Sequence, residues 1–354
     1  MTRPRFHALT VTAIHAEAED AVSVSFAIPA ALQDTFAFRP GQYLTVRRPD
    51  DPTDVRRAYS LCSIPTDGEL RIGVRELPGG ILSGWINREL RPGMTLECMP
   101  PDGHFAAPLA SPAARHVLLI AVGSGITPLL SLARATLAHP DSQVTLLYGN
   151  RRFSSLMFRE DLEDLKNQYL ARFALYCVFS RETQELSLYN GRVDGPRVAE
   201  FLRLLVPPDT LDAVCLCGPN AMLDAVEPIL EAAGIAPDQI FIERFGGADL
   251  PLLSRADIAA PASAQVTLIV DGIHRDIEIA DTVSILDAAR AAGLDLPFSC
   301  KSGVCATCRA RVLEGEVRMN RNFALLKADL TAGIVLACQA HPVTARVVLS
   351  FDER

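Results

Sequence analysis

Four cysteines near the C-terminus constrain the fold of this chain more than any other feature of its sequence. Three of them, Cys300, Cys305 and Cys308, follow the pattern Cys-x4-Cys-x2-Cys, and Cys338 comes after a long gap. Three thiolates so close together can wrap one loop around a face of a metal cluster, while the fourth must come from another segment. The apolar, strand-like run 333–339 supplies it. This spacing is typical of a plant-type [2Fe–2S] cluster, which carries one electron at a time.

Two alternatives compete with an iron–sulfur cluster at these cysteines. Zinc sites usually take their ligands from two Cys-x2–4-Cys pairs, and the second pair is missing here. A disulfide framework is disfavoured because the chain is long and shows no secretory signal. The sequence therefore favours the cluster, and zinc or plain structural cysteines remain the alternative.

The segments that precede the cysteines predict a small domain around them. Residues 266–270 and 276–279 alternate like two strands, and the turn Asp271-Gly272 between them indicates a β-hairpin. Residues 284–292 have the pattern of a short helix. A hairpin, a helix and a cysteine loop make a β-grasp domain, and over about the last ninety residues the chain resembles plant-type ferredoxins.

Length and charge exclude several classes of protein. With 354 residues, the chain is long enough for two or three domains. Its formal net charge of −8 offers no basic footprint for nucleic acid. The longest apolar run, near residues 117–122, is too short to cross a membrane, and the first residues lack the apolar core of a signal peptide. Nine cysteines without an export signal fit a reducing cytoplasm, where we expect the protein to work.

Stretches rich in proline, glycine and alanine divide the chain into three units. The first junction lies at residues 109–114, and residues 246–262 have the composition of a linker. The units are predicted to span residues 1–110, 111–245 and 263–354.

The first unit has the pattern of an antiparallel β-barrel. Short alternating segments, separated by turn residues, occur at residues 22–26, 43–46 and 70–74. Among them lies Arg57-Ala58-Tyr59-Ser60, where alternation places Arg57 and Tyr59 on one face of an extended strand and Ser60 on the other. Taken alone, this segment would be an ordinary half-buried strand.

A glycine turn follows in the same unit. The run Gly79-Gly80-Ile81-Leu82-Ser83 predicts the start of a helix, whose free amide groups can bind a pyrophosphate. Residues 101–105 then close the barrel. In this order, these segments resemble the flavin domain of the ferredoxin–NADP reductase superfamily.

That resemblance implies a flavin site. Arg57 would hold the flavin pyrophosphate, Tyr59 would pack on the isoalloxazine ring, and the hydroxyl of Ser60 would lie near its N5. The residues that would cradle the phosphates are Gly80, Ile81, Leu82 and Ser83. We expect FAD, with FMN as the alternative because related oxygenase reductases with the same domain order use it.

The second unit begins with residues 116–122, a continuous apolar run of the kind that forms a strand buried on both faces of a parallel sheet. The run leads into a glycine turn and a helix, an arrangement that binds phosphate. The fingerprint Gly-x-Gly-x-x-Gly is absent. The turn instead resembles the pyridine-nucleotide domain of the same superfamily. The nucleotide contacts that this implies are Gly123, Gly125, Ile126, Thr127 and Pro128.

Two further strand ends point to the same edge of the sheet, beyond which ligands of such sheets lie. Residues 144–148 run into Gly149-Asn150-Arg151, and residues 213–217 run into Gly218-Pro219. By the resemblance, Asn150 and Arg151 belong to the nucleotide site, and Cys217-Gly218-Pro219 borders the nicotinamide. For Cys217, a small buried hydrophobe is the alternative.

The resemblance also bears on the choice of nucleotide. Ser180-Arg181 follows residues 175–179, where NADP-specific members place a serine and an arginine. An arginine can meet the 2′-phosphate with a forked, charge-assisted contact, so we expect NADPH. NADH stays possible, since Arg181 can also be a solvated surface residue.

Glu243 matches a glutamate of the hydride cleft, and Phe245 matches an aromatic that stacks on the flavin, although it is not the chain terminus here. The candidate catalytic residues are Ser60, Cys217, Glu243 and Phe245.

The three units compose one electron path, from NAD(P)H to a flavin, to the cluster and outward. This domain order occurs in several oxygenase reductases, and the chain most closely resembles the reductase subunits of phenylacetyl-CoA 1,2-epoxidases. The segments that carry this likeness are residues 149–151, 158–160, 243–245, 301–308 and 335–339. It implies a di-iron oxygenase partner that epoxidises phenylacetyl-CoA.

Two alternatives for the function stay open. One is the reductase of a ring-hydroxylating or phenol-type oxygenase, and the other is a redox-sensing or metal-binding interaction protein without turnover. For the fold, we predict an antiparallel β-barrel flavin domain, an α/β parallel-sheet nucleotide domain and a β-grasp ferredoxin domain.

Overall fold

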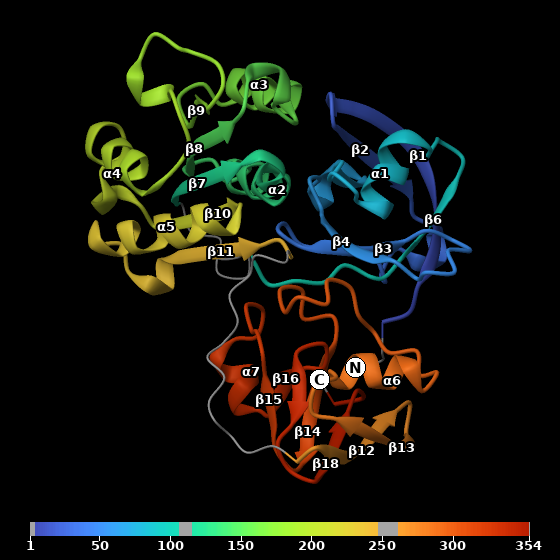
Figure 1. The fold of residues 1–354 in the computed structure, drawn as a ribbon. Coiled ribbons are helices and arrows are strands. Elements are labelled where there is room, and N and C mark those ends of the chain that lie inside the picture. Colours follow the sequence, from blue (N-terminus) through green and yellow to red (C-terminus); the bar gives the residue numbers. More distant parts are fainter. Residues whose placement is uncertain (1–3, 106–114, 247–260, 354) are drawn as a thin grey trace. The chain divides into compact units, whose positions relative to one another are not determined.

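The computed structural model describes residues 4–105, 115–246 and 261–353. The predicted junction at residue 110 and all but the ends of the predicted linker lie outside these ranges. The chain divides into two compact units (Figure 1). The larger comprises residues 7–55 and 59–245, and the smaller consists mainly of the C-terminal residues with the short segment Arg56–Ala58. No helix among the described residues is long and apolar enough to cross a membrane.

Residues 7–98 form a six-stranded sheet in the order β4-β3-β6-β1-β2-β5, with antiparallel pairings, and all of them except Arg56–Ala58 belong to the larger unit. Its elements are β1 (His7–Ala18), β2 (Ala21–Ala27), β3 (Tyr43–Arg47), β4 (Arg56–Ser60), β5 (Leu70–Arg75), helix α1 (Ile81–Arg88) and β6 (Thr95–Cys98). An antiparallel bridge between Leu61, next to β4, and Ile72 of β5 joins the two ends of the sheet. The predicted antiparallel barrel is thereby confirmed, and its interior is filled by apolar side chains such as Leu9, Leu44 and Ile72.

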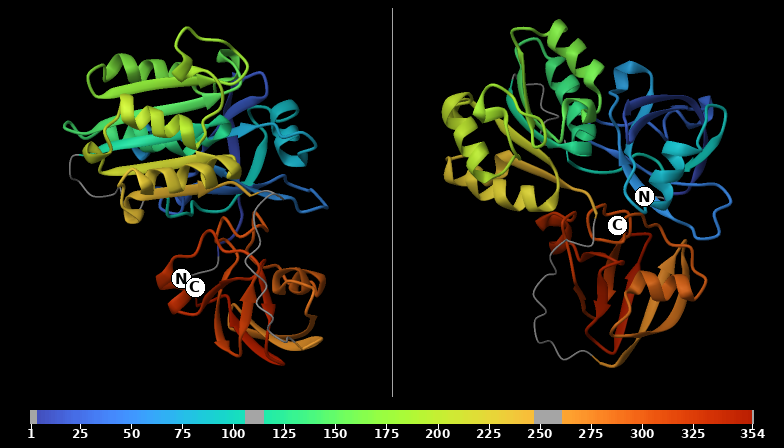
Figure 2. Two further views of the ribbon diagram at one scale, coloured as in Figure 1. Left: turned by 60° about the vertical axis from the view of Figure 1, so that its left-hand side comes forward. Right: turned by 45° about the horizontal axis from the view of Figure 1, so that its top comes forward.

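The rest of the larger unit is a five-stranded parallel sheet in the order β11-β10-β7-β8-β9, with helices on both faces (Figure 2). Its strands are β7 (His116–Val122), β8 (Gln143–Asn150), β9 (Phe173–Phe179), β10 (Ala213–Gly218) and β11 (Ile240–Arg244). Its helices are α2 (Ile126–Leu137), α3 (Arg159–Gln168), α4 (Gly195–Leu204) and α5 (Asn220–Ala232). The strand order reverses between β7 and β10, which is where ligands of such sheets bind.

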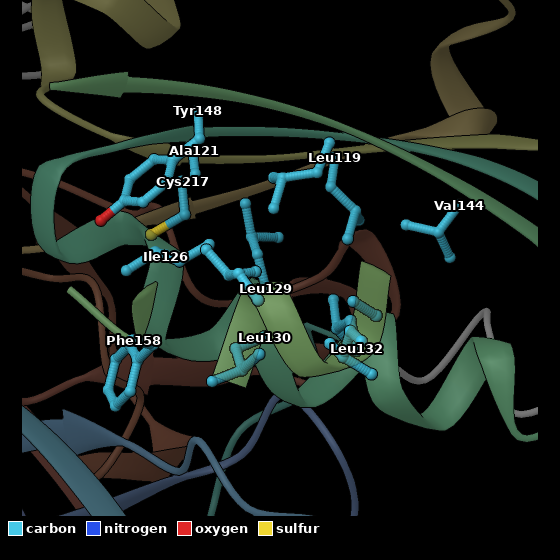
Figure 3. Close-up of a cluster of buried hydrophobic side chains, with 14 of the residues drawn as sticks. Leu119, Ala121, Ile126, Leu129, Leu130, Leu132, Val144, Tyr148, Phe158 and Cys217 are labelled. Atoms are coloured by element: carbon cyan, nitrogen blue, oxygen red, sulfur yellow. The ribbon is translucent and has the colours of Figure 1, made fainter. Parts of the chain in front are cut away.

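The apolar run of β7 is continuous because both faces of this sheet are covered. Leu119 and Ala121 pack with Leu129 of α2 in one core, shown in Figure 3, while Leu118 and Ile120 pack in a second core with residues of α4 and α5. This is the burial expected of a central parallel strand.

The smaller unit is a five-stranded sheet in the order β13-β12-β18-β14-β16, with a separate two-stranded pair β15-β17. Its elements are β12 (Ser263–Val270), β13 (Ile273–Ala280), α6 (Ile285–Ala291), β14 (Arg309–Glu314), β15 (Val317–Met319), α7 (Lys327–Thr331), β16 (Ile334–Leu336), β17 (Ala340–Pro342) and β18 (Arg346–Ser350). The predicted hairpin is present, with Asp271 (φ 51°) and Gly272 (φ 73°) in the left-handed conformation that tight hairpin turns require. The predicted helix begins at its N-cap Ser284, whose hydroxyl accepts a hydrogen bond from the amide of Asp287.

Candidate functional site

The predicted cluster ligands come together in the smaller unit. Cys300, Cys305 and Cys308 lie on the loop between α6 and β14, and Cys338 lies between β16 and β17. The four thiols form two hydrogen-bonded pairs, Cys300 with Cys305 and Cys308 with Cys338. The pKa of the Cys300 thiol is lowered, chiefly because Cys305 donates to it, with a further contribution from the amide of Ser302 at 3.3 Å.

This pairing distinguishes between the metals that the sequence left open. A [2Fe–2S] cluster holds two irons and takes four cysteine thiolates. Two pairs of thiols, one within the cysteine loop and one between that loop and Cys338, therefore fit a two-iron cluster better than a tetrahedral zinc site, which needs four ligands around one point.

Gln339, which the sequence analysis did not single out, joins the two segments that carry the cysteines. Its buried amide nitrogen Nε2 donates to the carbonyl of Lys301 at 2.9 Å and to the carbonyl of Cys338 at 3.1 Å, and it lies 3.5 Å from Cys338 Sγ. Gly303 (φ 82°) leaves room for it, because a Cβ there would lie 3.3 Å from Gln339 Cγ. In the sequence, the role of Gln339 was indicated only by its place as a polar residue directly after a predicted ligand cysteine.

Replacing Gln339 by methionine is expected to make the midpoint potential of the cluster more negative. An N–H group directed at a ligand sulfur stabilises the reduced, more negatively charged cluster, and methionine keeps the volume without the donor. Spectroelectrochemical titration measures the shift, with Gln265→Met on the exposed side of β12 as the control. Equal potentials for Gln339→Met and the wild type would contradict this role.

The predicted flavin residues lie on β4 and at the start of α1. Arg57 is exposed, Tyr59 packs at the edge of the barrel core, and Ser60 is buried, as the predicted alternation requires. The predicted glycine turn is also present: Gly79 is left-handed (φ 72°), and Gly80 is the N-cap of α1. The first turn of such a helix offers backbone amides to an anion.

The residues of this turn differ in which of their atoms could bind a phosphate. A Cβ on Gly80 would overlap Ser83 Oγ, and that hydroxyl accepts a hydrogen bond from the amide of Leu77 at 3.2 Å. The side chain of Leu82 is buried in the barrel core, whereas Ile81 is exposed. Leu82 can therefore contribute only its backbone to a phosphate site.

The predicted nucleotide loop lies between β7 and α2, against the end of β10. A Cβ on Gly125 would overlap the carbonyl oxygen of Cys217, so only glycine fits there. Thr127 Oγ1 donates to the carbonyl of Ser124 at 2.9 Å. Tyr148, a residue that sequence reasoning did not assign, donates from its buried hydroxyl to the carbonyl of Gly123 at 3.1 Å. Pro128 stands in the first turn of α2, as predicted.

The predicted catalytic residues Cys217 and Glu243 are neighbours. They are paired in the parallel register of β10 and β11, and Phe245 packs beside the core that contains Cys217. Glu243 as a whole is half-buried, but its Oε2 is buried and has no hydrogen-bond partner among the described residues. Burial raises the pKa of Glu243 to about 8 and, with the nearby carboxyl, raises that of Cys217 well above its usual range. An unsatisfied buried carboxyl is costly and fits a site that a ligand completes.

The remaining predicted nucleotide residues lie at or just beyond the ends of β8, β9 and β10. The amide of Arg181 donates to the carbonyl of Arg151 at 2.8 Å, and the amide of Ser180 donates to the carbonyl of Asn150 at 3.0 Å. Arg151, Ser180 and Arg181 have exposed side chains, and Asn150 is buried. Two arginines on adjacent strand ends thus stand together at the carboxyl edge of the sheet. Gly218 is the last residue of β10, and Pro219 is the N-cap of α5.

Comparison with known proteins agrees with this arrangement. Models of three families match in order: an oxidoreductase FAD-binding domain over residues 8–106, an oxidoreductase NAD-binding domain over 119–228, and a 2Fe-2S iron-sulfur cluster binding domain over 268–343. The chain is 43% identical to a subunit of the 1,2-phenylacetyl-CoA epoxidase of Escherichia coli K12, covering 99% of this chain and 98% of that protein. It is 34% identical to the ferredoxin reductase component of 3-ketosteroid-9-alpha-monooxygenase from Rhodococcus rhodochrous, covering 97% and 96%.

Solved structures show the same fold. Phthalate dioxygenase reductase superimposes with a TM-score of 0.60 at 23% identity, covering 98% of both chains. An intact type IV self-sufficient cytochrome P450 monooxygenase matches with a TM-score of 0.69 at 25% identity, covering 97% of this chain and 41% of that one. The predicted fold class, with its barrel, parallel sheet and ferredoxin domain, is therefore confirmed.

Proposed function

The chain belongs to the family of oxygenase reductase components that join FAD-binding, NAD-binding and 2Fe-2S domains, and on this premise we propose which oxygenase it serves, which nucleotide it prefers and which residues hold its cofactors. As a member, it is an NAD(P)H-dependent oxidoreductase that passes electrons through FAD and a [2Fe–2S] cluster to an oxygenase component. A sensor without turnover does not fit this family. A cytoplasmic location stays a prediction from the cysteine content.

The oxygenase partner proposed here is a phenylacetyl-CoA 1,2-epoxidase with a di-iron centre. The observation that carries this proposal is the 43% identity to the Escherichia coli epoxidase component along nearly the full length of both chains, against 34% for the ketosteroid monooxygenase reductase. The test is reconstitution with purified oxygenase components. Phenylacetyl-CoA epoxidation that depends on this chain supports the proposal, whereas turnover only with a ketosteroid, ring-hydroxylating or phenol-type oxygenase refutes it.

The proposed division of labour follows the three predicted domains, with boundaries at residues 1–110, 111–245 and 263–354 and a linker at 246–262. FAD would be held by Arg57, Tyr59 and Ser60 and by the turn from Gly80 to Ser83. When bound, FAD accepts a hydride and releases single electrons, and the cluster carries them onward. The protein residues hold and orient these groups. Cys217 and Glu243 would border the nicotinamide, and Phe245 would cover the flavin face.

NADPH is the proposed reductant because Arg151 and Arg181 stand together where the 2′-phosphate of the adenosine would lie. In this proposal, the pyrophosphate of the nucleotide is bound by Gly123, Gly125, Ile126, Thr127 and Pro128. Other parts of the nucleotide are contacted by Asn150, Ser180, Gly218 and Pro219. The exposed side chains of both arginines leave their guanidinium groups available to a phosphate.

Replacing Arg181 by alanine is expected to lower kcat/KM for NADPH by about 10- to 100-fold, the usual worth of a charged hydrogen bond, and to leave NADH nearly unchanged. Steady-state reduction of an artificial acceptor with each nucleotide measures the ratio. The exposed Arg203 of α4 provides the matched control, Arg203→Ala. Equal efficiencies of the wild type with NADPH and NADH would refute the preference itself.

A further inference from the structure

Strand β5 of the barrel has two faces with different tasks. Leu70, Ile72 and Val74 fill the interior of the barrel. The alternate residues Arg71, Gly73 and Arg75 each contact the nucleotide-binding half of the same unit. Since side chains alternate along a strand, these three lie in a row on the outer face. None of them belongs to the residues assigned above to the flavin or the nucleotide.

At Gly73 the backbone of the barrel lies close to the nucleotide-binding half. A Cβ built there would lie 2.7 Å from Cζ of Phe158 and 3.0 Å from Cγ2 and Oγ1 of Thr127. The distance to Phe158 is shorter than a side chain makes without displacing its neighbour, and the two distances to Thr127 are tighter than most real contacts of a Cβ. Glycine weakens the interior of a strand, and it often marks a position where another segment comes close. Here the segment is the start of α2, which carries the proposed nucleotide loop.

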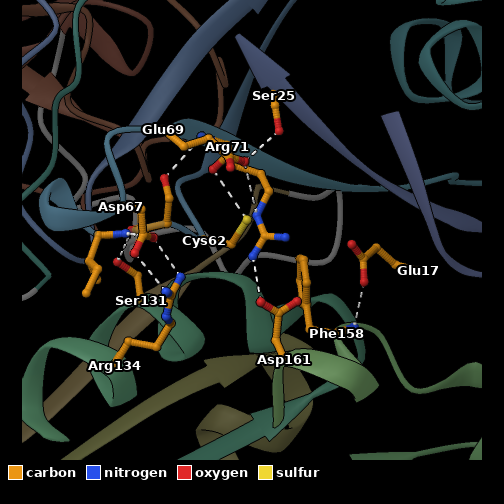
Figure 4. A network of polar contacts seen from close by, with 12 residues as sticks. Glu17, Ser25, Cys62, Asp67, Glu69, Arg71, Ser131, Arg134, Phe158 and Asp161 are labelled. Atoms are coloured by element: carbon orange, nitrogen blue, oxygen red, sulfur yellow. Dashed lines mark hydrogen bonds and ion pairs between the residues drawn. The ribbon is translucent and has the colours of Figure 1, made fainter. Parts of the chain in front are cut away.

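Phe158 is the second part of this contact. It is fully buried and forms the N-cap of α3 in a left-handed conformation (φ 56°). Its amide donates to Glu17 Oε2 of β1 at 3.1 Å (Figure 4). A non-glycine residue with positive φ is strained and persists when its surroundings hold it. Barrel residues therefore hold Phe158 both by packing and by a hydrogen bond.

Charged contacts flank Gly73 on both sides along the strand. Arg71 Nη2 lies 2.8 Å from Asp161 Oδ1 in the first turn of α3, and the side chains of both residues are mostly buried (Figure 4). Arg75 Nη2 donates to the carbonyl of Ser155 at 2.8 Å. Partly buried, well-aligned pairs of this kind fix geometry more firmly than exposed pairs do.

We propose that Gly73 is a positioning residue. Its close approach to Phe158, next to the ion pair of Arg71, sets the spacing between the proposed flavin site and the proposed nicotinamide site. The inference rests on the proposed function, because it concerns the hydride transfer that this unit performs. Gly73 belongs to the barrel, and its missing side chain leaves the space that Thr127 of the nucleotide loop and Phe158 occupy. A displacement at this point therefore changes the distance over which the hydride moves, and such transfers lose rate steeply with misplacement.

The first test is Gly73→Ala in the full-length holoprotein. Stopped-flow mixing with NADPH is expected to show flavin reduction slowed by about tenfold or more, with a Kd for NADPH within about threefold of the wild type. FAD content and the melting temperature report on folding: FAD content is expected to change little, while overpacking is expected to lower the melting temperature by several degrees. A kinetic isotope effect with NADPH deuterated at C4 identifies the hydride step as the one that slows. A role in folding alone would instead lower FAD content without this change in the rate per bound flavin.

A second variant tests the contact itself. Phe158→Leu removes the outer ring atoms that the new methyl group would meet, so Gly73→Ala combined with Phe158→Leu is expected to recover most of the lost rate. Arg71→Gln is an independent test for the case that Gly73→Ala does not fold. It is expected to slow flavin reduction several-fold. Arg47→Gln is its control, because Arg47 pairs with Glu97 and Asp54 inside the barrel.

The outcomes separate this inference from the proposed function. A wild-type protein whose flavin is reduced by neither nucleotide would overturn both. Normal reduction in the wild type, with unaltered rates in Gly73→Ala or in Arg71→Gln, would overturn the inference alone. A loss in Gly73→Ala that Phe158→Leu does not relieve would also overturn it, because the proposed spacing depends on that contact.

Discussion

Replacing Cys308 by serine is expected to abolish delivery of electrons to the oxygenase while FAD stays bound and NADPH still reduces it. Cys308 is buried, and its thiol pairs with Cys338. A serine hydroxyl stays protonated at neutral pH and is a poor ligand for iron in a sulfur site. Loss of an outer-shell partner typically lowers metal affinity or activity by roughly 10- to 100-fold, and loss of a direct ligand should lower them further.

Two measurements separate the cluster from the rest of the path. Iron content is expected to fall from two irons per chain in the wild type toward none, and electron transfer to the oxygenase should disappear. Reduction of ferricyanide, which can take electrons from the flavin directly, should continue. Cys177→Ser on β9 is the matched control, because Cys177 is half-buried and lies outside the motif. Full iron content and normal delivery in Cys308→Ser would show that this thiol is not a ligand.

The sequence predicted the elements that local pattern determines. The apolar run 116–122 was confirmed residue for residue as β7, because a strand covered on both faces needs apolar side chains throughout. The glycine turn before α1 was also confirmed, with Gly79 in the left-handed conformation. Such features depend on neighbouring residues alone, so a single sequence contains them.

Two of the predicted strand limits differ in the structure, one because of strand pairing and one because of a turn. The prediction ended one strand at Tyr148, but β8 continues to Asn150 because Asn150 pairs with Phe179 of β9. The apolar run before Cys338 was predicted as strand-like, but β16 ends at Leu336. The chain then turns, with the amide of Gln339 bonded to the carbonyl of Leu336 at 2.8 Å, and this turn presents Cys338 to the cysteine loop.

The residues that sequence reasoning missed act through contacts between distant segments. Gln339 bonds to Lys301, Tyr148 to Gly123, and Gly73 makes room for Phe158. Each looks ordinary in its local context: a glutamine after a cysteine, an aromatic in a strand and a glycine in a strand. Periodicity and turn chemistry report how a segment folds, but they contain no information on which segment packs against it.

The stability of the larger unit is expected to fall as pH rises from about 5 to 8, and Glu243 is the cause. Burial raises the pKa of Glu243 from 4.5 to about 8 in the folded protein. Below pH 4.5, the carboxyl is protonated in both the folded and the unfolded states. Between these values, the unfolded chain releases the proton and the folded protein keeps it, so the free energy of unfolding decreases with each pH unit. The loss is complete above about pH 8 and amounts to at most about 4–5 kcal/mol.

Replacing Glu243 by glutamine is expected to remove this dependence, because the amide keeps the shape of the protonated carboxyl and does not ionise. The melting temperature of the larger unit, followed by the fluorescence of released FAD, should fall in the wild type by roughly 10 °C more than in Glu243→Gln between about pH 5 and 8. Glu231→Gln, an exposed site on α5, should behave like the wild type. If Glu243→Gln and the wild type lost stability in parallel, the carboxyl would already be ionised in the folded protein, and the raised pKa would be wrong.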